Sequence, residues 1–575
     1  MFRMAALYVV ASWLIMQVAE VIFTLGGLPN WTGRILLVVL ACGLPIALMM
    51  SWFYQLTPEG VRLEDDASPN AVVPQHAGRR LDFVVISILC AAVLVFAADK
   101  WWPRGPFEQS IAVLPFVNLS NDPEREYFSD GISEELLGVM MRIPNIRVIS
   151  RTSSFSFKGK LLKLTDIARE LNVAHILDGS VRIFGDRVRI TAQLVDARSD
   201  TQLWAETFDR KFGDIFAIQD EIAAAVVDQL EIQLVGPRPR VPETSPEAYA
   251  LYLQGLYLAH QLTIETLQKS NEYMQMALDI DSGYAPAWDI LANNYVFLGG
   301  YGLLSFEEGF RLANGAIDKA LAIDPTLAHA HSLRGRIALN VDNDLAAAAR
   351  HYKRALELDA THDDIIRGAG VLLLSLGRID MAMAFNEYAI EQDPVNPMGY
   401  GNLGMGYVTA GRWDDAIAAC RKALALSPDF ISAHYCVGEA LRFRGDPASA
   451  LEEFQKESLE ALKLVGSAMA YHDLGQSSQS DAAMAELIDK HGETMAAQIA
   501  YVFDYRDETD KVFEWLAKAV QNKDPGITLL GTGTVYFSNS SKDPRWEPFL
   551  RELGYSQQQL DAIEFDVAPP KGYAR

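Results

Sequence analysis

The sequence predicts a multidomain protein in which transmembrane helices are followed by a small α/β domain and then by an all-α repeat solenoid. Three observations predict this class: long apolar runs near the start, alternation of apolar and polar residues over 175–195, and a helix-closing motif that recurs every 34 or 35 residues. At 575 residues the chain is also too long for a single hydrophobic core. We therefore expect several domains in series.

Apolar runs predict three transmembrane helices. Runs over 5–24 and 35–54 form a transmembrane hairpin within residues 1–54, and a third helix lies within 82–102. Twenty residues at the helical rise span about 30 Å, the thickness of a bilayer core. A cleavable signal peptide is the alternative for the first run, but a second run follows it at once. The mostly polar stretch 55–81, which contains three prolines, is expected to be a flexible linker.

Basic residues near the ends of the spans predict their orientation. The side that holds residue 1 and the 55–81 linker carries more of them, and it is therefore expected to be cytoplasmic. An odd number of spans then places everything after the third one on the far side of the membrane. The basic residues on the cytoplasmic side are Arg3, Arg62, Arg79 and Arg80, and the first turn carries only Arg34.

The stretch 107–235 has the pattern of a small α/β domain. Its first apolar run, 110–117, predicts a buried strand in which Pro115 implies a bulge or an edge position. A helix capped by Asp130 follows this strand. Further along the chain, apolar and polar residues alternate on both sides of Gly185, and this pattern predicts a β-hairpin.

Four short motifs in this stretch resemble the TolB amino-terminal-like domain, which occurs in bacterial envelope proteins ahead of helical repeats. These motifs are 111–119 (IAVLPFVNL), 127–135 (YFSDGISEE), 175–180 (HILDGS) and 203–206 (LWAE). Residues 55–60 (QLTPEG) are similar to the membrane region of the same proteins. The resemblance and the orientation together imply a multi-pass protein of the bacterial inner membrane whose C-terminal domains lie in the periplasm.

Some proteins of this kind carry an adenylate or guanylate cyclase domain, or a winged-helix DNA-binding domain, at their cytoplasmic end. In this sequence only the first few residues precede the first apolar run, so neither activity is carried over from the resemblance. The net charge is −24, from 74 acidic and 50 basic residues. This excess of acid argues against a nucleic-acid partner, whose phosphates require a basic surface.

Helix-closing tetrads determine the register of the repeat region. They are 322–325 (AIDP), 357–360 (ELDA), 391–394 (EQDP) and 425–428 (ALSP). Within 397–428, apolar and small residues such as Leu403, Gly404 and Ala416 fall at offsets that resemble the tetratricopeptide repeat. The resemblance implies pairs of antiparallel helices over 245–522, and a C-terminal tail, 523–575, is expected to cap the stack.

In tetratricopeptide arrays the first helix of each repeat faces a concave groove. Here the groove positions mix charged, aromatic and apolar residues, which suits an extended protein or peptide segment. The alternative is that this face is merely solvated. The lysine and asparagine set that clamps a terminal carboxylate in some repeat proteins is not evident. The candidate partner-binding residues are Asp289, Asn293, Arg336, Arg367, Asn402, Met405, Tyr435 and Glu439.

The sequence contains no evident catalytic constellation. Gly399, Gly401 and Gly404 match the dinucleotide-binding pattern, but they lie in a repeat helix and not between a strand and a helix. The histidines are scattered, so neither a metal nor a cofactor is predicted. Cys420 and Cys436 lie on adjacent repeat helices, and we expect them to pair only in an oxidising compartment.

These patterns predict a membrane-anchored scaffold or sensory binding protein that is not an enzyme and that binds a protein or peptide. The alternative is the sensory half of a cyclase or transcription-regulatory system whose effector domain is missing or lies on another chain. A third possibility is an enzyme of unrecognised fold. The sequence leaves the oligomeric state open.

Overall fold

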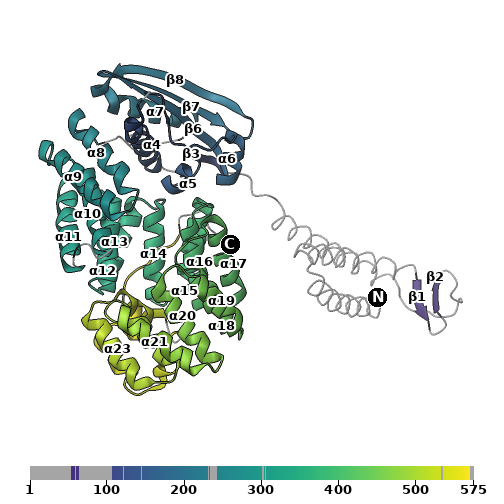
Figure 1. Ribbon diagram of the computed structural model, residues 1–575. Coiled ribbons are helices and arrows are strands. Elements are labelled where there is room, and N and C mark those ends of the chain that lie inside the picture. The colour runs from purple at the N-terminus through teal and green to yellow at the C-terminus, as the bar shows by residue number, and fades with distance from the viewer. Residues whose placement is uncertain are drawn as a thin grey trace. The chain divides into compact units, whose positions relative to one another are not determined.

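The computed structural model describes residues 54–57, 60–63, 107–120, 122–143, 146–230, 232, 242–300, 304, 306–532 and 535–569 (Figure 1). The chain divides into two compact units, Met1–Gly105 and Pro106–Arg575. In the first unit, strands β1 (Tyr54–Thr57) and β2 (Gly60–Leu63) form an antiparallel hairpin. A hairpin therefore occupies the start of the stretch predicted to be an unstructured linker.

The predicted fold class is wrong in its transmembrane part. Among the described residues, no helix combines the length with the apolar character that a bilayer crossing requires. The predicted spans 5–24, 35–54 and 82–102 lie outside the described residues, except that Tyr54 begins β1. The same finding contradicts the predicted multi-pass location in a bacterial inner membrane with periplasmic C-terminal domains.

The second unit begins with an α/β domain built on a six-stranded sheet of order β5-β3-β6-β7-β8, with β4 paired to β6. β3 runs parallel to β5 and β6, whereas β6, β7 and β8 are antiparallel. The strands are β3 (Phe107–Val113), β4 (Val117–Asn118), β5 (Arg147–Val148), β6 (Val173–Phe184), β7 (Arg187–Asp196) and β8 (Thr201–Lys211). The helices are α4 (Glu126–Met141), α5 (Arg151–Phe155), α6 (Leu164–Leu171) and α7 (Ile215–Gln229).

Alternation along the strands sends side chains to two different cores. Ile111 and Val113 pack with α4 and α7 on one face of the sheet, while Ala112 packs with α6 on the other. The predicted hairpin at Gly185 is confirmed, because β6 pairs with β7 over 175–184 and 187–196 and Gly185 has a positive φ of 63°. As expected at Pro115, the strand is interrupted there. β3 ends at Val113, and β4 begins at Val117.

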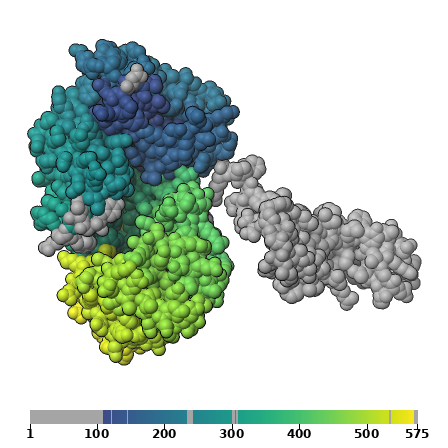
Figure 2. All heavy atoms as spheres, in the orientation of Figure 1, coloured from purple at the N-terminus to yellow at the C-terminus, as the bar shows by residue number. Residues whose placement is uncertain are grey.

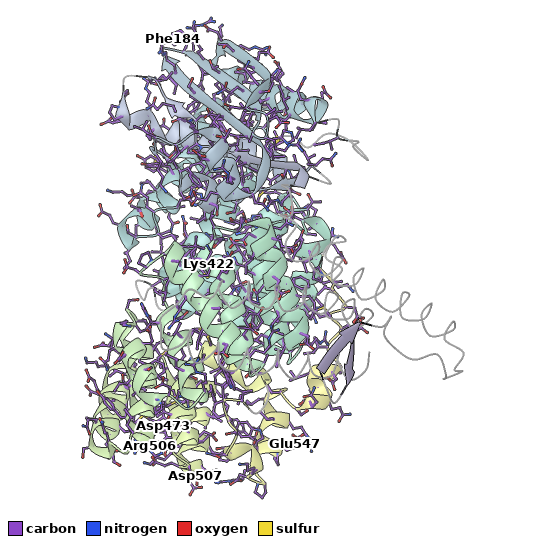
Figure 3. The ribbon with its side chains drawn as sticks, turned by 90° about the vertical axis from the view of Figure 1, so that its right-hand side faces the viewer. Phe184, Lys422, Asp473, Arg506, Asp507 and Glu547 are labelled. Carbon is purple, nitrogen blue, oxygen red and sulfur yellow. A yellow bond between two sulfur atoms is a disulfide. The ribbon has the colours of Figure 1, made fainter. Side chains whose placement is uncertain are left out.

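Successive antiparallel helix pairs follow the α/β domain. The pairs are α8 (Pro246–Ala259) with α9 (Ile264–Ile280), α10 (Ala285–Gly300) with α11 (Phe306–Ile323), α12 (Ala328–Asn340) with α13 (Leu345–Leu358), α14 (Asp363–Ser375) with α15 (Ile379–Gln392), α16 (Pro397–Thr409) with α17 (Trp413–Leu426), α18 (Ala433–Phe443) with α19 (Pro447–Lys456), α20 (Glu460–Asp473) with α21 (Ser477–His491), and α22 (Ala496–Tyr505) with α23 (Thr509–Gln521). The first helices of neighbouring pairs lie side by side and form an inner layer. In Figure 3, Asp473 and Arg506 lie at the end of this unit that is far from Phe184 of β6.

Neighbouring helix pairs pack through a contact that recurs along the array. An aromatic ring on the second helix of a pair enters the space between glycines on two first helices. Phe454 of α19 is fully buried, and a Cβ atom at either Gly438 or Gly466 would overlap its ring. Tyr352 of α13 has the same relation to Gly335 and Gly368. These glycines of the first helices are therefore the places where the aromatic rings approach the helices most closely.

A disulfide joins Cys420 of α17 to Cys436 of α18, a pairing that the sequence analysis made conditional on an oxidising compartment. A Cβ atom at Gly404 of α16 would overlap the Cys420 sulfur, so the disulfide fills the space left by this glycine.

We expect the Cys420→Ala, Cys436→Ala double variant to lower the free energy of unfolding by about 3 kcal/mol, because the disulfide limits the freedom of the unfolded chain. Urea unfolding monitored by circular dichroism measures the change. Dithiothreitol should destabilise the wild type by a similar amount and leave the double variant unaffected. Equal stability of the oxidised wild type and the double variant would contradict this expectation.

The C-terminal tail contains η4 (Pro525–Thr532), η5 (Ser540–Lys542), α24 (Trp546–Leu553) and α25 (Gln557–Asp561). It reaches back to repeats far from the end of the stack. The Tyr555 hydroxyl donates to Asn343 Oδ1 at 2.6 Å, and Arg378 donates to the carbonyls of Ile563 at 2.6 Å and Phe565 at 3.0 Å. η4 contacts both α12 and α14. The tail therefore covers part of the inner layer, where the sequence predicts a terminal cap.

Candidate partner-binding surface

The polar residues of α10, α12 and the start of α14 form one cluster, which we call the inner surface. Figure 2 shows the second unit hollowed between its teal and green repeats. The inner surface combines four of the predicted groove residues with residues that the sequence analysis did not single out for binding a partner. It consists of Asp289, Asn293, His329, Arg336, His362, Asp363, Asp364 and Arg367.

Asp289 and His329 form the part of this cluster that lies nearest to α10. His329 Nδ1 and Asp289 Oδ2 are 2.7 Å apart, and only 7% of Asp289 is exposed. Burial alone lowers the pKa of His329, but the Asp289 carboxylate outweighs this effect, so the net shift is upward. The His329 ring also lies 5.8 Å from that of His362, centroid to centroid. His329 therefore connects α10 with the start of α14.

Arg336 and Arg367 are the guanidinium groups of the inner surface. Arg336 donates to Asn293 Oδ1 at 3.0 Å. Arg367 donates to Asp363 Oδ2 at 2.9 Å and also pairs with Asp364. Asp364 is exposed to solvent, and Arg367 and the neighbouring histidines hold its pKa well below its usual range. The carboxylates and guanidiniums therefore largely neutralise one another.

Three buried polar atoms of the inner surface have no hydrogen-bond partner among the described residues: Asp289 Oδ1, Arg336 Nε and His362 Nδ1. Buried polar groups in folded proteins are nearly always paired, and an unpaired one costs about 1–3 kcal/mol. Within the part of the chain that the structure describes, no group of His, Cys, Asp and Glu is arranged to hold a metal ion. These three atoms are enclosed by the protein, so only the partly exposed portions of Asn293, Arg336 and Arg367 are open to a partner.

The other four predicted groove residues lie further along the array and do not join this cluster. Asn402 and Met405 of α16 are half-buried, and Met405 packs against the core of the repeats. Tyr435 and Glu439 of α18 are 6% and 0% exposed, so they present no open surface to a partner. Glu439 instead accepts hydrogen bonds from Arg442 at 3.2 Å and from the Tyr501 hydroxyl at 2.9 Å.

The tail explains part of this burial. The Tyr536 ring lies 5.2 Å from that of Tyr501, edge to face, and Tyr536 is close enough to Glu439 and Arg442 for their charges to affect its pKa. Tyr435 is likewise affected by the Tyr536 hydroxyl. The tail therefore occupies the inner side of the array around α18 and α22, whereas the inner surface lies on α10, α12 and the start of α14.

Four residues of the inner surface, His329, His362, Asp363 and Asp364, were not among the predicted partner-binding residues. One signal was available: His329 precedes Arg336 by seven residues, two helical turns, so both fall on one face of α12. The position of His362 just before α14, where it meets His329, depends on how the two repeats pack and is not encoded in local spacing.

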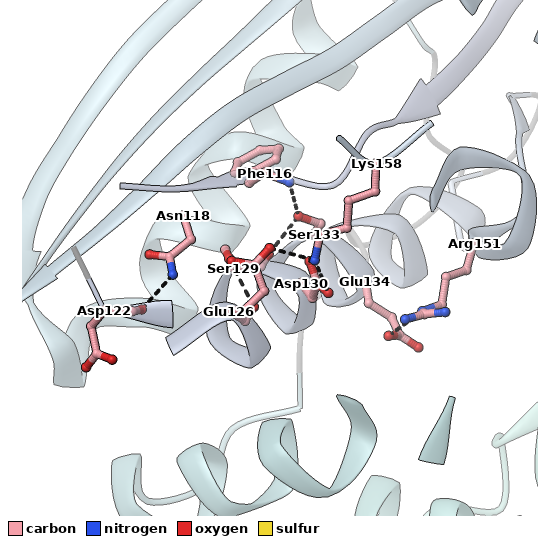
Figure 4. Close-up of polar contacts among 10 residues, drawn as sticks. All are labelled: Phe116, Asn118, Asp122, Glu126, Ser129, Asp130, Ser133, Glu134, Arg151 and Lys158. Carbon is pink, nitrogen blue, oxygen red and sulfur yellow. Dashed lines mark hydrogen bonds and ion pairs between the residues drawn. The ribbon is translucent and has the colours of Figure 1, made fainter. Parts of the chain in front are cut away.

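The α/β domain docks onto the first repeat through α4, the helix that carries the YFSDGISEE motif. Figure 4 shows the polar contacts of this helix. Ser133 Oγ accepts a hydrogen bond from the Phe116 amide at 2.8 Å and donates one to the Ser129 carbonyl. The first of these bonds holds the segment between β3 and β4 against α4. Lys158 lies 2.6 Å from both Asp130 oxygens, so the segment after α5 is also held.

The same helix contacts α8. A Cβ atom at Gly131 would overlap the Leu253 side chain, so the two helices approach closely at this glycine. The Tyr252 hydroxyl donates to Glu135 Oε1 at 2.9 Å, and burial raises the pKa of Glu135 to about 7. The motif residues thus fasten the α/β domain internally and join it to the first repeat.

A second junction lies at the loop between α15 and α16. The Ser150 and Ser153 hydroxyls donate to the buried Asp393 carboxylate, and Arg147 donates to the carbonyls of Glu391 at 2.6 Å and Gln392 at 3.1 Å. Burial raises the pKa of Asp393 to about 6, against the lowering effect of the two serine hydrogen bonds. The α/β domain therefore contacts the array at two points that are far apart in sequence.

This raised pKa predicts a pH dependence of stability. The folded protein binds the Asp393 proton more tightly than the unfolded chain does, so its contribution to stability should fall as pH rises from about 4 to about 6 and stay constant above. Because one pKa unit corresponds to about 1.4 kcal/mol, the fall is roughly 3 kcal/mol. Urea unfolding of the wild type and of Asp393→Asn across this range should show the difference. Parallel pH profiles for the two proteins would contradict it.

Family models described as "Tetratricopeptide repeat" match residues 333–397 and 397–430. These residues are tetratricopeptide repeats. The predicted presence of tetratricopeptide repeats is thereby confirmed over 333–430, and repeats of this kind imply protein or peptide partners. The resemblance of 107–235 to the TolB amino-terminal-like domain stays a prediction.

Known proteins are similar to parts of the chain. A relative from Rhizobium meliloti (strain 1021), named "Putative adenylate cyclase 3", is 39% identical over 189 residues, which are 32% of this chain and 32% of that protein. The chain thus spans about a third of the length of this relative. The crystal structure of PilW, a type IV pilus biogenesis factor, is 22% identical with a TM-score of 0.30, covering 35% of this chain and 93% of PilW. Pseudomonas aeruginosa pilF is 18% identical with a TM-score of 0.30, covering 41% and 98%.

Proposed function

We propose that this protein is a scaffold or sensory binding module that takes a protein or peptide partner on the inner surface of α10, α12 and α14. The observation that carries the proposal is a row of partly exposed polar side chains, Asn293, Arg336 and Arg367, on successive first helices of a tetratricopeptide-repeat array. A bound partner would hydrogen-bond to the exposed parts of these side chains.

The position of the tail supports this choice of surface. The tail buries the inner side of the array around Glu439 and Tyr536, so a partner would have to displace a packed core to bind there. Although η4 of the tail also contacts α12 and α14, Asn293, Arg336 and Arg367 stay partly exposed, and the inner surface extends over three successive first helices. An extended segment lying across these helices would contact all of them.

Affinity capture tests the proposal. The full chain, wild type or Arg336→Glu, is used to capture proteins from an extract of its own cells, and the captured proteins are quantified by mass spectrometry. Arg350→Glu, on the exposed side of α13, is the matched control because it makes the same change of charge elsewhere. We expect a partner that is lost with Arg336→Glu and retained with Arg350→Glu. Equal recovery with both variants would show that this surface does not bind the partner.

A second candidate function is a part in a cyclase signalling system, as its sensory half. The match to the Rhizobium meliloti relative favours this candidate, because that protein is named as an adenylate cyclase. Cyclic AMP formation from ATP can be measured for the purified chain and for the proteins captured with it. The candidate requires cyclase activity that co-purifies with the wild type and falls with Arg336→Glu. Captured fractions without cyclase activity would count against it.

A further inference from the structure

We propose that the α/β domain holds the repeat array at a fixed curvature across the inner surface, and that release of its contact with the loop between α15 and α16 spreads the first helices and weakens partner binding. This inference rests on the proposed function, because it concerns the regulation of that same site. We call this contact the Asp393 latch. It joins Arg147, Ser150 and Ser153 of the α/β domain to residues 391–393.

Contacts between neighbouring repeats do not by themselves fix the curvature of the array. The extensive contacts within it join consecutive helices and the first helices of neighbouring pairs, such as α10 with α12 and α12 with α14. Small changes of angle from one pair to the next therefore add up along the array. The spacing of the first helices determines the shape of the inner surface, so this shape depends on contacts of longer range.

The α/β domain supplies contacts that skip over several repeats. α4 packs on α8 in the first helix pair, where Leu253 lies against Gly131. The Thr361 hydroxyl, just before α14, donates to the Met141 carbonyl at the end of α4 at 3.5 Å. Asp393 in the latch lies just before α16. Because α10 and α12 lie between these points along the chain, the α/β domain spans the helices that carry the inner surface.

The latch is the weaker end of this span. At the other end, Tyr249 and Leu253 of α8 are fully buried in one core with apolar residues of the α/β domain. At the latch, hydrogen bonds from Ser150 and Ser153 hold the Asp393 carboxylate. Separation at α8 would expose apolar surface to water, whereas water can replace the hydrogen bonds of the latch. The latch therefore opens before the contact between α4 and α8.

Hydrogen bonds lead from the latch to the inner surface. Asn396, three residues after Asp393, donates to Asp363 Oδ2 at 3.0 Å. The same Asp363 oxygen accepts from Arg367 Nε at 2.9 Å, and Arg367 is partly exposed on the inner surface. A shift of the loop that contains Asn396 therefore displaces a pair of residues on the inner surface.

The tail holds the opposite ends of the first helices. Asn343 follows α12 and Arg378 follows α14, and both bond to the tail. Thr361 and Asp393, in contrast, precede α14 and α16. When the latch is released, the tail still holds C-terminal ends of first helices, while the N-terminal end of α16 can move. The first helices therefore spread at one end only.

Distances between nitroxide labels on the full chain, measured by double electron–electron resonance, test this movement. Labels are attached to cysteines at exposed positions, with one pair at the N-terminal ends of α12 and α16 and a second pair at their C-terminal ends. The first pair replaces Thr326 and Met398, and the second replaces Asp342 and Ala410. Cys42 and Cys90 are replaced by serine in every protein, while Cys420 and Cys436 take no label because they are paired.

The latch is broken by Ser150→Ala with Ser153→Ala, and independently by Asp393→Ala. Ser154→Ala is the control, because Ser154 is a buried serine beside Ser153 that makes no hydrogen bond to Asp393. Circular dichroism confirms that the variants keep their helices. In both latch variants the N-terminal labels should move apart by more than about 2 Å, the size of an ordinary helix shift, while the C-terminal labels keep their distance. Unchanged distances in both latch variants overturn the inference.

Affinity capture then separates this inference from the proposed function. Partner recovery should fall at least about fivefold in both latch variants, the lower end of typical coupling between two sites, and should not fall with Ser154→Ala. Unchanged recovery although the labels move apart overturns the regulation and leaves the proposed function intact. If the wild type captures no partner that is lost with Arg336→Glu, the proposed function is overturned, and regulation of partner binding with it.

Discussion

Replacing Arg442 with alanine is expected to lower the free energy of unfolding by about 3–5 kcal/mol, because it leaves the Glu439 carboxylate buried without its ionic partner. Both side chains are inaccessible to solvent, and the guanidinium lies 3.2 Å from each Glu439 oxygen. The guanidinium also donates to the Tyr501 hydroxyl at 2.5 Å, so its loss weakens the contact between α18 and α22. Urea unfolding followed by circular dichroism measures the loss.

Two further variants show whether burial is the cause. Adding Glu439→Gln to Arg442→Ala removes the uncompensated charge and should restore a substantial part of the lost stability. Arg444→Ala removes an arginine two residues away whose ion pair with Asp414 is solvent-exposed, and it should cost less than about 1 kcal/mol. If Arg442→Ala is no more destabilising than Arg444→Ala, the buried pair does not have this role.

Phe537→Ala is expected to have an effect of similar size, about 3–5 kcal/mol, because it removes a fully buried ring from the contact between tail and array. The Phe537 ring lies 5.4 Å from the Trp546 ring and 6.3 Å from that of Tyr501. Its loss should loosen the tail before the repeats unfold. Hydrogen exchange measured by mass spectrometry should then rise first in the peptides of α18, which the tail covers.

The matched control for this variant is Phe184→Ala, at the end of β6, where the ring is 40% exposed. Truncation of a ring this exposed should change stability by less than about 1 kcal/mol. If Phe537→Ala leaves both stability and hydrogen exchange in α18 unchanged, the tail does not pack on the inner layer in solution. The explanation for the burial of Tyr435 and Glu439 would then be lost.

The repeat array and the β6–β7 hairpin were predictable because both depend on short-range patterns. The tetrads from 322–325 to 425–428 recur at the length of one helix pair, and Gly185 marks a two-residue turn between alternating strands. The position of the tail was not predictable in this way. It depends on contacts such as Tyr555 with Asn343 and Arg378 with Phe565, between residues that are far apart in the sequence.

The candidate site shows the same division. Helical periodicity predicts which face of each first helix Asp289, Asn293 and Arg336 occupy, and in the structure Arg336 bonds to Asn293 while Asp289 pairs with His329. Periodicity also predicted that Tyr435 and Glu439 line the groove. It could not show that they are covered, because it does not reveal which other segment packs on a face. The transmembrane prediction rested on the apolar runs alone and is contradicted by the absence of a suitable helix among the described residues.

Site-specific photo-crosslinking tests most directly whether the inner surface is where the partner binds. p-Benzoylphenylalanine is placed at Asn293, half-buried on the inner surface, or at the exposed Arg350 of α13, and the full chain is irradiated in an extract of its own cells. We predict a crosslinked protein or peptide from position 293 and none from position 350. Crosslinking at 350 without crosslinking at 293 would contradict the account.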